Sequence, residues 1–316
     1  MVVQMKEHFD FYSKTSLKSY NLNETMRYQL AMLDSLDAFT RVHSENVANI
    51  TCRLCERLGM HSDFVVYCTI CGYLHDIGKL FIPLEILQKP GPLTNEEYEI
   101  MKKHAAMGYK MCMDDPTLRP YANGPKYHHE ALNGSGYPEG LTKGEIPIEG
   151  QIIRVADEFD AIVSKRHYKT HIGVTDTLKH LIKEAEPSIP KSVALKSLEE
   201  NAKIGKLNPK IVKKLCKVVI EDIEYEISCI FDYTKYLKEE IERLEQISTY
   251  NIQMEKTKNE KKKEYYKAGM EQLLQNREDL RNYKYVLEEY RTALLTRKEV
   301  INNLFDEIKQ IKKLKI

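Results

Sequence analysis

Tryptophan is absent from this 316-residue chain, and no stretch of it is apolar for long enough to cross a membrane. The first residues, MVVQMKEHFDFYSK, lack the apolar core of a secretory signal, so we expect a cytoplasmic protein with no membrane partner. An excess of one charge is also missing, because the formal net charge is +1 although charged residues make up 30%. That balance gives no overall reason to expect a nucleic-acid partner.

The seven cysteines are too few for a disulfide scaffold in a chain of this length, and they indicate a reducing compartment. Cys52 with Cys55, and Cys68 with Cys71, form two CxxC pairs that could hold a structural zinc ion. Zinc ribbons place such pairs on tight turns, whereas both pairs here fall in strongly helical segments. We therefore interpret the four thiols as small apolar residues on helix faces.

Apolar residues at helical spacing predict an all-α protein. Helices are expected over residues 24–58, 63–76 and 148–166, and less distinctly over 170–226, with a break near Pro187 and Pro190. Glycine and proline predict a helix end at Gly59 and loops at 78–92, 114–125 and 133–138. Thr94 and Glu97 have the spacing of a capping box, which predicts the start of a helix that carries His104.

The chain changes character after Pro209, its last proline, and from about residue 228 it is rich in lysine and glutamate, with Gly269 as its one breaker. A repeat of apolar and aromatic residues at spacings of three and four predicts a coiled coil or a helical hairpin. The repeat comprises Leu280, Tyr283, Leu287, Tyr290, Leu294, Ile301, Leu304, Ile308 and Ile311. The stretch 256–263 is either the tip between antiparallel helices or a frayed part of one long helix. Because such a face needs burial, we expect a homodimer, a partner protein or a chain folded back on itself.

These observations predict three regions. Residues 1–33 form an N-terminal helical segment, residues 34–226 form the main helical domain, and residues 227–316 form the coiled-coil or hairpin region.

Seven histidines and aspartates could bind metal ions, because imidazole and carboxylate together suit iron, manganese, zinc or nickel. The candidate metal ligands are His43, His75, Asp76, His104, His128, His129 and Asp157. Adjacent ligands such as His75 and Asp76 cannot both point along one helix face, but at a helix end they can converge, with the aspartate bridging two ions. A lone histidine on a helix is more often structural, so the joint occurrence of these residues carries the interpretation.

The chain resembles the HD-GYP phosphodiesterases, a branch of the HD-domain metallohydrolases. The resemblance covers residues 34–170 well and 171–226 loosely. It is carried in order by His75-Asp76-Ile77-Gly78-Lys79, His104, His128-His129-Glu130, Gly134-Ser135-Gly136-Tyr137-Pro138, Val155-Ala156-Asp157 and Arg166-His167-Tyr168-Lys169. It implies an all-α HD-domain bundle holding two divalent ions, with iron or manganese expected and zinc or nickel also suited. His167 stands where the family has proline, and Asn133 where it has aspartate.

The resemblance also implies a role for each residue. One ion would be held by His43, His75, Asp76 and Asp157, and the other by Asp76, His104, His128 and His129. Some relatives hold a third ion through a glutamate one turn before the first histidine, but that position is Phe39 here. Asp76 and Lys79 would take part in catalysis, and substrate would contact Tyr137, Arg166 and Lys169.

The implied activity is hydrolysis of cyclic di-GMP, a bacterial second messenger, to pGpG or GMP by a hydroxide that bridges the two ions. Two alternatives stay open from the sequence. One is a hydrolase for another cyclic dinucleotide or nucleotide. The other is a non-catalytic module that senses the dinucleotide or assembles partners through the coiled coil.

Overall fold

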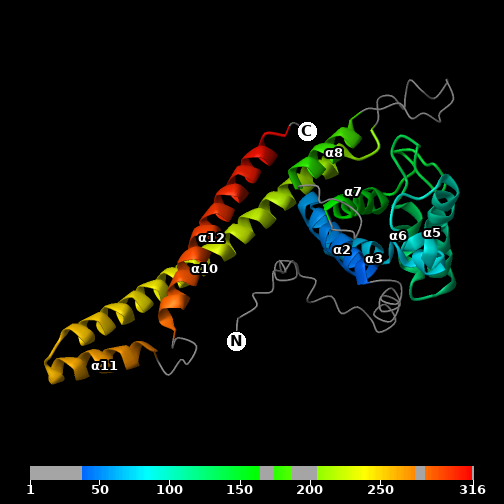
Figure 1. Ribbon diagram of the computed structural model, residues 1–316. Helices are drawn as coiled ribbons and strands as arrows, with labels where there is room; N and C mark the ends of the chain where they lie inside the picture. Colours follow the sequence, from blue (N-terminus) through cyan, green and yellow to red (C-terminus); the bar gives the residue numbers. More distant parts are fainter. Residues whose placement is uncertain (1–37, 164–173, 187–204, 275–281, 315–316) are drawn as a thin grey trace. The chain divides into compact units, whose positions relative to one another are not determined.

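A computed structural model describes residues 38–163, 174–186, 205–274 and 282–314 (Figure 1). The described residues form helices and no strand, apart from an isolated antiparallel bridge between Asn133 and Thr142. The predicted all-α class is therefore confirmed. The chain divides into two compact units between Val219 and Ile220, and the long helix α10, Pro209–Lys256, belongs to both.

The first unit is a bundle of helices with short connections. Its elements are α2 (Ala38–Leu58), α3 (Ser62–Leu74), η3 (Ile77–Phe81), α4 (Leu84–Leu87), α5 (Asn95–Asp114), η4 (Arg119–Tyr121), α6 (Asn123–Tyr127), α7 (Ile148–Val163), α8 (Val174–Ala185) and the start of α10. Helix α2 packs against both α3 and α7, and α5 packs against η3 and α6.

Local sequence signals set several of these helix ends. Gly59 follows α2 with φ of 74°, a left-handed conformation that glycine adopts without a Cβ penalty. The capping box is confirmed, because Thr94 Oγ1 accepts the N–H of Glu97 and Glu97 Oε2 accepts the N–H of Thr94. Helix α3 ends at Leu74, so His75 and Asp76 stand at a helix end as expected.

Two predicted loops contain short helices, which is a correction to the sequence interpretation. The region 78–92 includes η3 and α4, and the region 114–125 includes η4 and the start of α6. Proline and glycine punctuate these segments without preventing single helical turns, because proline is tolerated in the first turn. The expected helical residues 24–37 and 164–166, and the break near Pro187 and Pro190, lie outside the described residues.

The paired cysteines lie in the core of the bundle. All four side chains, Cys52, Cys55, Cys68 and Cys71, are fully buried on helices α2 and α3. Burial raises the pKa of Cys52 to about 12 and also raises that of Cys71. Their burial on helix faces agrees with the interpretation as apolar core residues.

Two glycines let η3 and α5 touch through their backbones. A Cβ atom on Gly78 would lie 1.9 Å from the carbonyl oxygen of His104 and 2.5 Å from the amide nitrogen of Gly108. Only glycine can occupy position 78 at this separation. The contact brings the part of α5 that carries His104 against the chain immediately after His75 and Asp76.

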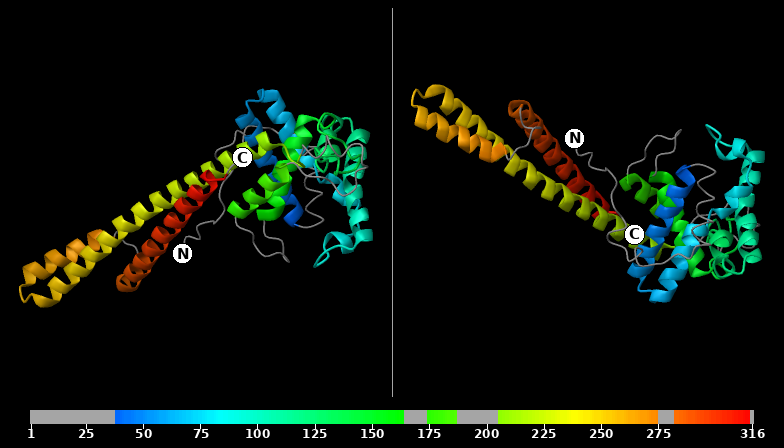
Figure 2. Two further views of the ribbon diagram at one scale, coloured as in Figure 1. Left: turned by 90° about the horizontal axis from the view of Figure 1, so that it is seen from above. Right: turned by 90° about the horizontal axis from the view of Figure 1, so that it is seen from below.

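The second unit is a helical hairpin made by α10, α11 (Glu260–Leu274) and α12 (Tyr283–Lys312). The turn after Lys256 reverses the chain, so α11 runs back along the end of α10, and α12 lies beside α10 in all three views (Figures 1 and 2). Of the two interpretations of 256–263, the tip between antiparallel helices is confirmed.

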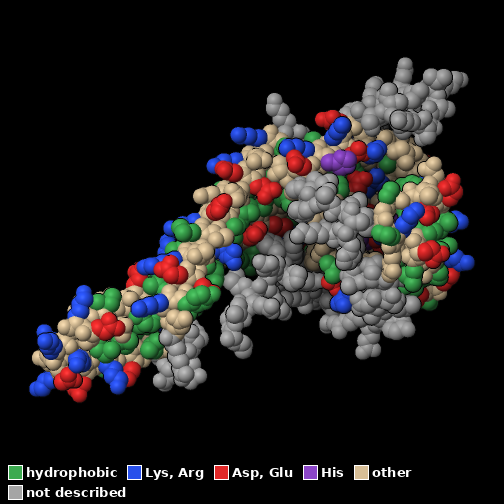
Figure 3. Space-filling view, in the orientation of Figure 1, with side chains coloured by type: hydrophobic (Ala, Val, Ile, Leu, Met, Phe, Trp, Pro, Cys, Tyr) green, Lys and Arg blue, Asp and Glu red, His purple; other side chains and the backbone are tan. Residues whose placement is uncertain are grey.

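The described part of the predicted 3-4 repeat, which begins at Tyr283, faces the inside of this hairpin. Leu287 of α12 packs in a buried cluster with Ile241, Leu244 and Ile247 of α10. Arg291 pairs with Glu245 across the two helices at 2.6 Å. The part of the repeat that the structure describes, from Tyr283 to Ile311, is therefore buried or half-buried within one chain, while a homodimer or a partner protein at these helices stays a prediction. Charged side chains of both signs are spread over the visible face of the hairpin (Figure 3).

Gly269, the breaker noted in the sequence, marks the close contact between α11 and α10. A Cβ atom there would lie 2.6 Å from the ring of Tyr250. The glycine gives the tyrosine ring room against α11, which explains its presence inside a helix.

None of the described helices combines the length and the apolar character that a membrane crossing requires.

Replacing Gly78 by alanine should lower the free energy of unfolding by about 3 kcal/mol, because the added methyl group meets backbone that cannot move aside. Gly144→Ala is the matched control, since a Cβ there meets no atom within 4 Å. Urea denaturation of the two variants tests this expectation. Equal stability of both variants would contradict the close packing of η3 on α5.

Candidate metal centre

Three buried histidines of the bundle are held by the same kind of hydrogen bond. In each, Nδ1 donates to a backbone carbonyl three residues earlier in the chain. The bonds join His75 to Gly72 (2.7 Å), His104 to Met101 (2.6 Å) and His128 to Pro125 (2.9 Å). A carbonyl oxygen only accepts, so Nδ1 must carry the proton, and Nε2 of a neutral ring then presents a lone pair.

His43 is oriented by a carboxylate in the equivalent way. Its Nδ1 lies 2.7 Å from Asp160 Oδ2, and the other oxygen of Asp160 accepts a hydrogen bond from Asn46 at 3.0 Å. Its Nε2 lies 3.1 Å from Asp157 Oδ1. Carboxylates that fix a histidine in this manner are common behind metal ligands.

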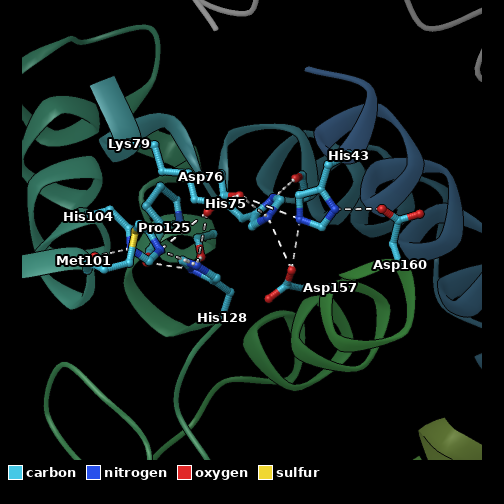
Figure 4. A network of polar contacts seen from close by, with 12 residues as sticks. His43, His75, Asp76, Lys79, Met101, His104, Pro125, His128, Asp157 and Asp160 are labelled. Carbon is cyan, nitrogen blue, oxygen red and sulfur yellow. Dashed lines mark hydrogen bonds and ion pairs between the residues drawn. The ribbon is translucent and has the colours of Figure 1, made fainter. Parts of the chain in front are cut away.

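Asp76 lies between two groups of histidines and turns one oxygen to each (Figure 4). Oδ2 is 3.2 Å from His75 Nε2 and 3.7 Å from His43 Nε2. Oδ1 is 3.4 Å from His104 Nε2 and 3.9 Å from His128 Nε2. Lys79 forms an ion pair with the same carboxylate. A carboxylate placed in this way could bind one cation through each of its oxygens.

The ligand atoms converge in two sets, which we call the Asp157 set and the His129 set. The first contains His43, His75 and Asp157, and the second contains His104, His128 and His129; within each set one ligand atom per residue lies within 4.8 Å of the others. In the part of the chain that the structure describes, no cysteine belongs to such a set. A site of this composition can hold metal ions.

Two observations on the histidine nitrogens indicate that protein groups alone do not complete the site. His75 Nε2 is buried and has no hydrogen-bond partner. His104 Nε2 and His128 Nε2 are 3.1 Å apart, although the carbonyl bonds have already placed the ring proton of each on Nδ1. Two facing lone pairs repel unless a cation or a proton lies between them. The donor set therefore fits metal ions.

The two sets differ in their electrostatics. Burial lowers the pKa of both His104 and His128, which favours the neutral imidazole that binds metals. Burial would also lower the pKa of His43, but hydrogen bonds with Asp157 and Asp160 raise it to about 9. The His129 set is thus neutral, while the Asp157 set attracts positive charge.

The carboxylate of Asp76, between the two sets, carries a stabilised negative charge. Burial alone would raise the pKa of Asp76, but its interactions with His75 and with the ammonium group of Lys79 outweigh burial and hold that pKa well below its usual range. Asp157 behaves in the same way through its hydrogen bond to His43. Both carboxylates are ionised at neutral pH and can act as ligands.

The loop that contains the expected substrate contact, Tyr137, packs against the His129 set. The tyrosine ring stacks on the His129 ring at 4.5 Å between centroids. The backbone N–H of Tyr137 donates to the carbonyl oxygen of His129 at 3.1 Å. Gly136 allows this approach, since a Cβ there would lie 2.3 Å from the nitrogen of Ala131. Two further expected contacts, Arg166 and Lys169, lie outside the described residues.

Glu130, which follows the two histidines directly, organises the same loop. Its buried carboxylate accepts three successive backbone N–H groups, from Glu139 (2.7 Å), Gly140 (3.2 Å) and Leu141 (2.8 Å). Neither Glu130 nor Asp160 had a predicted role. The i, i+3 spacing of Asp157 and Asp160 on one helix was a usable signal for the latter. No local pattern reveals that Glu130 reaches residues nine to eleven positions ahead.

Comparison with known proteins agrees with this geometry. The model of the HD domain family matches residues 22–207, more than half of the chain, so the chain belongs to the HD domain family. The relatives below support its assignment to the HD-GYP branch, as the motifs had indicated.

Three curated relatives illustrate the similarity. A cyclic di-GMP phosphodiesterase of Thermotoga maritima is 47% identical over 135 residues, which cover 42% of this chain and 37% of the relative. The cyclic di-GMP phosphodiesterase response regulator RpfG of Xanthomonas campestris is 36% identical over 148 residues, 46% of this chain and 40% of the relative. The 3'3'-cGAMP-specific phosphodiesterase 1 of Vibrio cholerae is 33% identical over 163 residues, which cover 50% of this chain and 37% of the relative. The chain thus spans well under half the length of these relatives.

Replacing Glu130 by glutamine should lower the free energy of unfolding by about 1–3 kcal/mol, because an amide offers one acceptor oxygen where the carboxylate serves three N–H groups. Glu139→Gln is the control: its side chain is exposed, so we expect a change within about 0.5 kcal/mol. Urea denaturation compares the two. Equal losses would show that the carboxylate of Glu130 does not hold the loop.

Proposed function

We propose that this chain is a metal-dependent phosphodiesterase that hydrolyses cyclic di-GMP to pGpG or GMP. The observation that carries the proposal is the placement of Asp76, with one oxygen toward His43 and His75 and the other toward His104 and His128. Relatives 47% and 36% identical to the matched region are named cyclic di-GMP phosphodiesterases, which supports the choice of substrate.

Two divalent ions are the cofactors in this proposal. The Asp157 set would hold one and the His129 set the other, with Asp76 contributing to both. Imidazole and carboxylate ligands suit iron and manganese, our first expectation, as well as zinc and nickel. Phe39, one turn before His43 on α2, offers no ligand atom, which favours two ions over three.

When bound, such ions lower the pKa of water and neutralise charge on a phosphoryl group. The chain's own residues complete the site. Lys79, paired with Asp76, places an ammonium group beside the two sets, where it can stabilise charge that develops on the leaving oxygen. Its side chain is only 15% exposed, so little solvent weakens that interaction.

Substrate contacts follow from position. Tyr137 stacks on His129 and so stands at the edge of the His129 set, where a bound dinucleotide would meet it. Arg166 and Lys169 remain our expected contacts for phosphate or guanine edges, because arginine binds both in a bidentate manner and lysine provides a point charge.

A second candidate substrate is 3'3'-cGAMP. Three relatives from Vibrio cholerae, 33%, 33% and 36% identical over their matched regions, are named 3'3'-cGAMP-specific phosphodiesterases. The two dinucleotides share both phosphodiester bonds and differ in one base, so the centre described above suits either of them. Specificity would then depend on residues that touch the bases.

The protein loaded with manganese, or with iron under anaerobic conditions, should convert cyclic di-GMP to pGpG or GMP. Chromatography coupled to mass spectrometry identifies the products, with 3'3'-cGAMP tested in parallel. Asp76→Ala should abolish turnover, because it removes a ligand from both ions. Absence of turnover with either metal and either dinucleotide would overturn the proposal, and tight binding without turnover would favour a sensing module.

Asp160→Asn should lower metal affinity by about tenfold to a hundredfold, since it weakens the support of His43 without removing a ligand. Metal titration of the metal-free protein measures this effect. Asp176→Asn on α8 is the control, because it makes the same chemical change at an exposed site. Unchanged affinity in Asp160→Asn would exclude the proposed support.

A further inference from the structure

Lys102 of α5 lies between two tyrosine rings. Its ammonium nitrogen is 4.9 Å from the ring centroid of Tyr98, one turn earlier on the helix, and 5.8 Å from the ring centroid of Tyr137. Both distances fall in the range of cation–π attraction. A positive charge is therefore fixed beside the loop that covers one side of the candidate metal centre.

The two tyrosines connect this charge to the His129 set. The Tyr137 ring stacks on His129 and meets the edge of His104 at 6.4 Å between centroids. Lys102 is thus separated from the candidate ligands by one aromatic ring. Tyr98 is 46% exposed as a residue, so an aromatic side chain next to the lysine is open to a ligand.

Lys102 contributes little to the stability of the fold through its ion pair. Its ion-pair partner is Glu99, 2.6 Å away, whose side chain is 66% exposed. Surface pairs of this kind contribute roughly 0–1 kcal/mol, so a phosphate group can replace the glutamate at small cost. A surface cation–π pair alone would also account for the contact, and the test below separates that role from a binding role.

A cyclic dinucleotide presents two phosphates and two bases, and a centre that cleaves one phosphodiester bond leaves the other phosphate and its neighbouring base to be bound by side chains outside the metal centre. We propose that Lys102 and Tyr98 form a second subsite, in which the ammonium binds the non-reacting phosphate and the tyrosine ring stacks against a nucleobase. Base–aromatic stacking and a phosphate–lysine contact are the interactions these two side chains can make. The subsite rests on the proposed function and extends it to substrate recognition.

The test compares two substrates that share the reacting group. Bis(p-nitrophenyl) phosphate has one diester and no nucleobase, so it can use the metal centre without the second subsite. Lys102→Gln and Tyr98→Ala should each raise KM for cyclic di-GMP about tenfold, the cost of losing one charged or stacking contact. Neither should change kcat for the dinucleotide or kcat/KM for the small diester by more than about twofold.

Lys103→Gln is the matched control, because it removes the same charge from an exposed neighbour on α5. It should leave KM for both substrates unchanged, and Tyr98→Phe should retain most of the affinity because it keeps the aromatic face. Metal content is measured for every variant.

Three results would overturn the subsite. One is a parallel loss on both substrates, which would mean that Lys102 supports the centre or the fold. Another is unchanged KM in both variants, and the third is an equal effect of Lys103→Gln. Failure of the proposed function is distinguishable, because the unmodified protein would then cleave the small diester and neither dinucleotide, or neither kind of substrate.

Discussion

The candidate centre depends on hydrogen bonds that four of its imidazoles make with the side of the ring that faces away from it. Backbone carbonyls hold Nδ1 of His75, His104 and His128, and Asp160 holds Nδ1 of His43. With the protons of His75, His104 and His128 fixed there, the remaining nitrogens of these three rings turn lone pairs toward Asp76. Such a concentration of lone pairs around a buried carboxylate is unfavourable in itself, and a cation relieves it. The bundle is therefore organised around a positive charge that its own side chains do not fully supply.

Backbone contacts determine whether these rings can meet. The histidines come from α2, the end of α3, α5 and the end of α6, and each element must approach within a few ångströms of the others. Glycine at position 78 permits the approach of α5, and its place three residues after His75 explains why the two occur in one short motif. The glycine of the motif and the close packing therefore have one cause. Because Gly78 has no side chain, α5 can bring His104 close to the end of α3.

Much of the fold could be predicted from the sequence, because local signals set it. Thr94 and Glu97 fix the start of α5 through their own side chains, and the repeat through Leu287 identifies the face that is buried in the hairpin. The set of site residues came from the motifs and the family resemblance. The division of the hairpin into three helices, and the parts played by Asp160 and Glu130, depend on contacts between residues far apart or between side chain and backbone. Periodicity carries no information about such contacts.

The three N–H groups gathered by Glu130 have a thermodynamic consequence for the Tyr137 loop. A loop of glycine, serine and proline would ordinarily lose conformational entropy when a ligand orders it, at roughly 1–2 kcal/mol for each residue fixed. Here one buried carboxylate fixes three successive residues when the chain folds. The conformational entropy of these residues is therefore lost when the chain folds and not when a ligand binds. A ligand that contacts Tyr137 meets a preorganised surface, so more of its interaction energy remains as affinity.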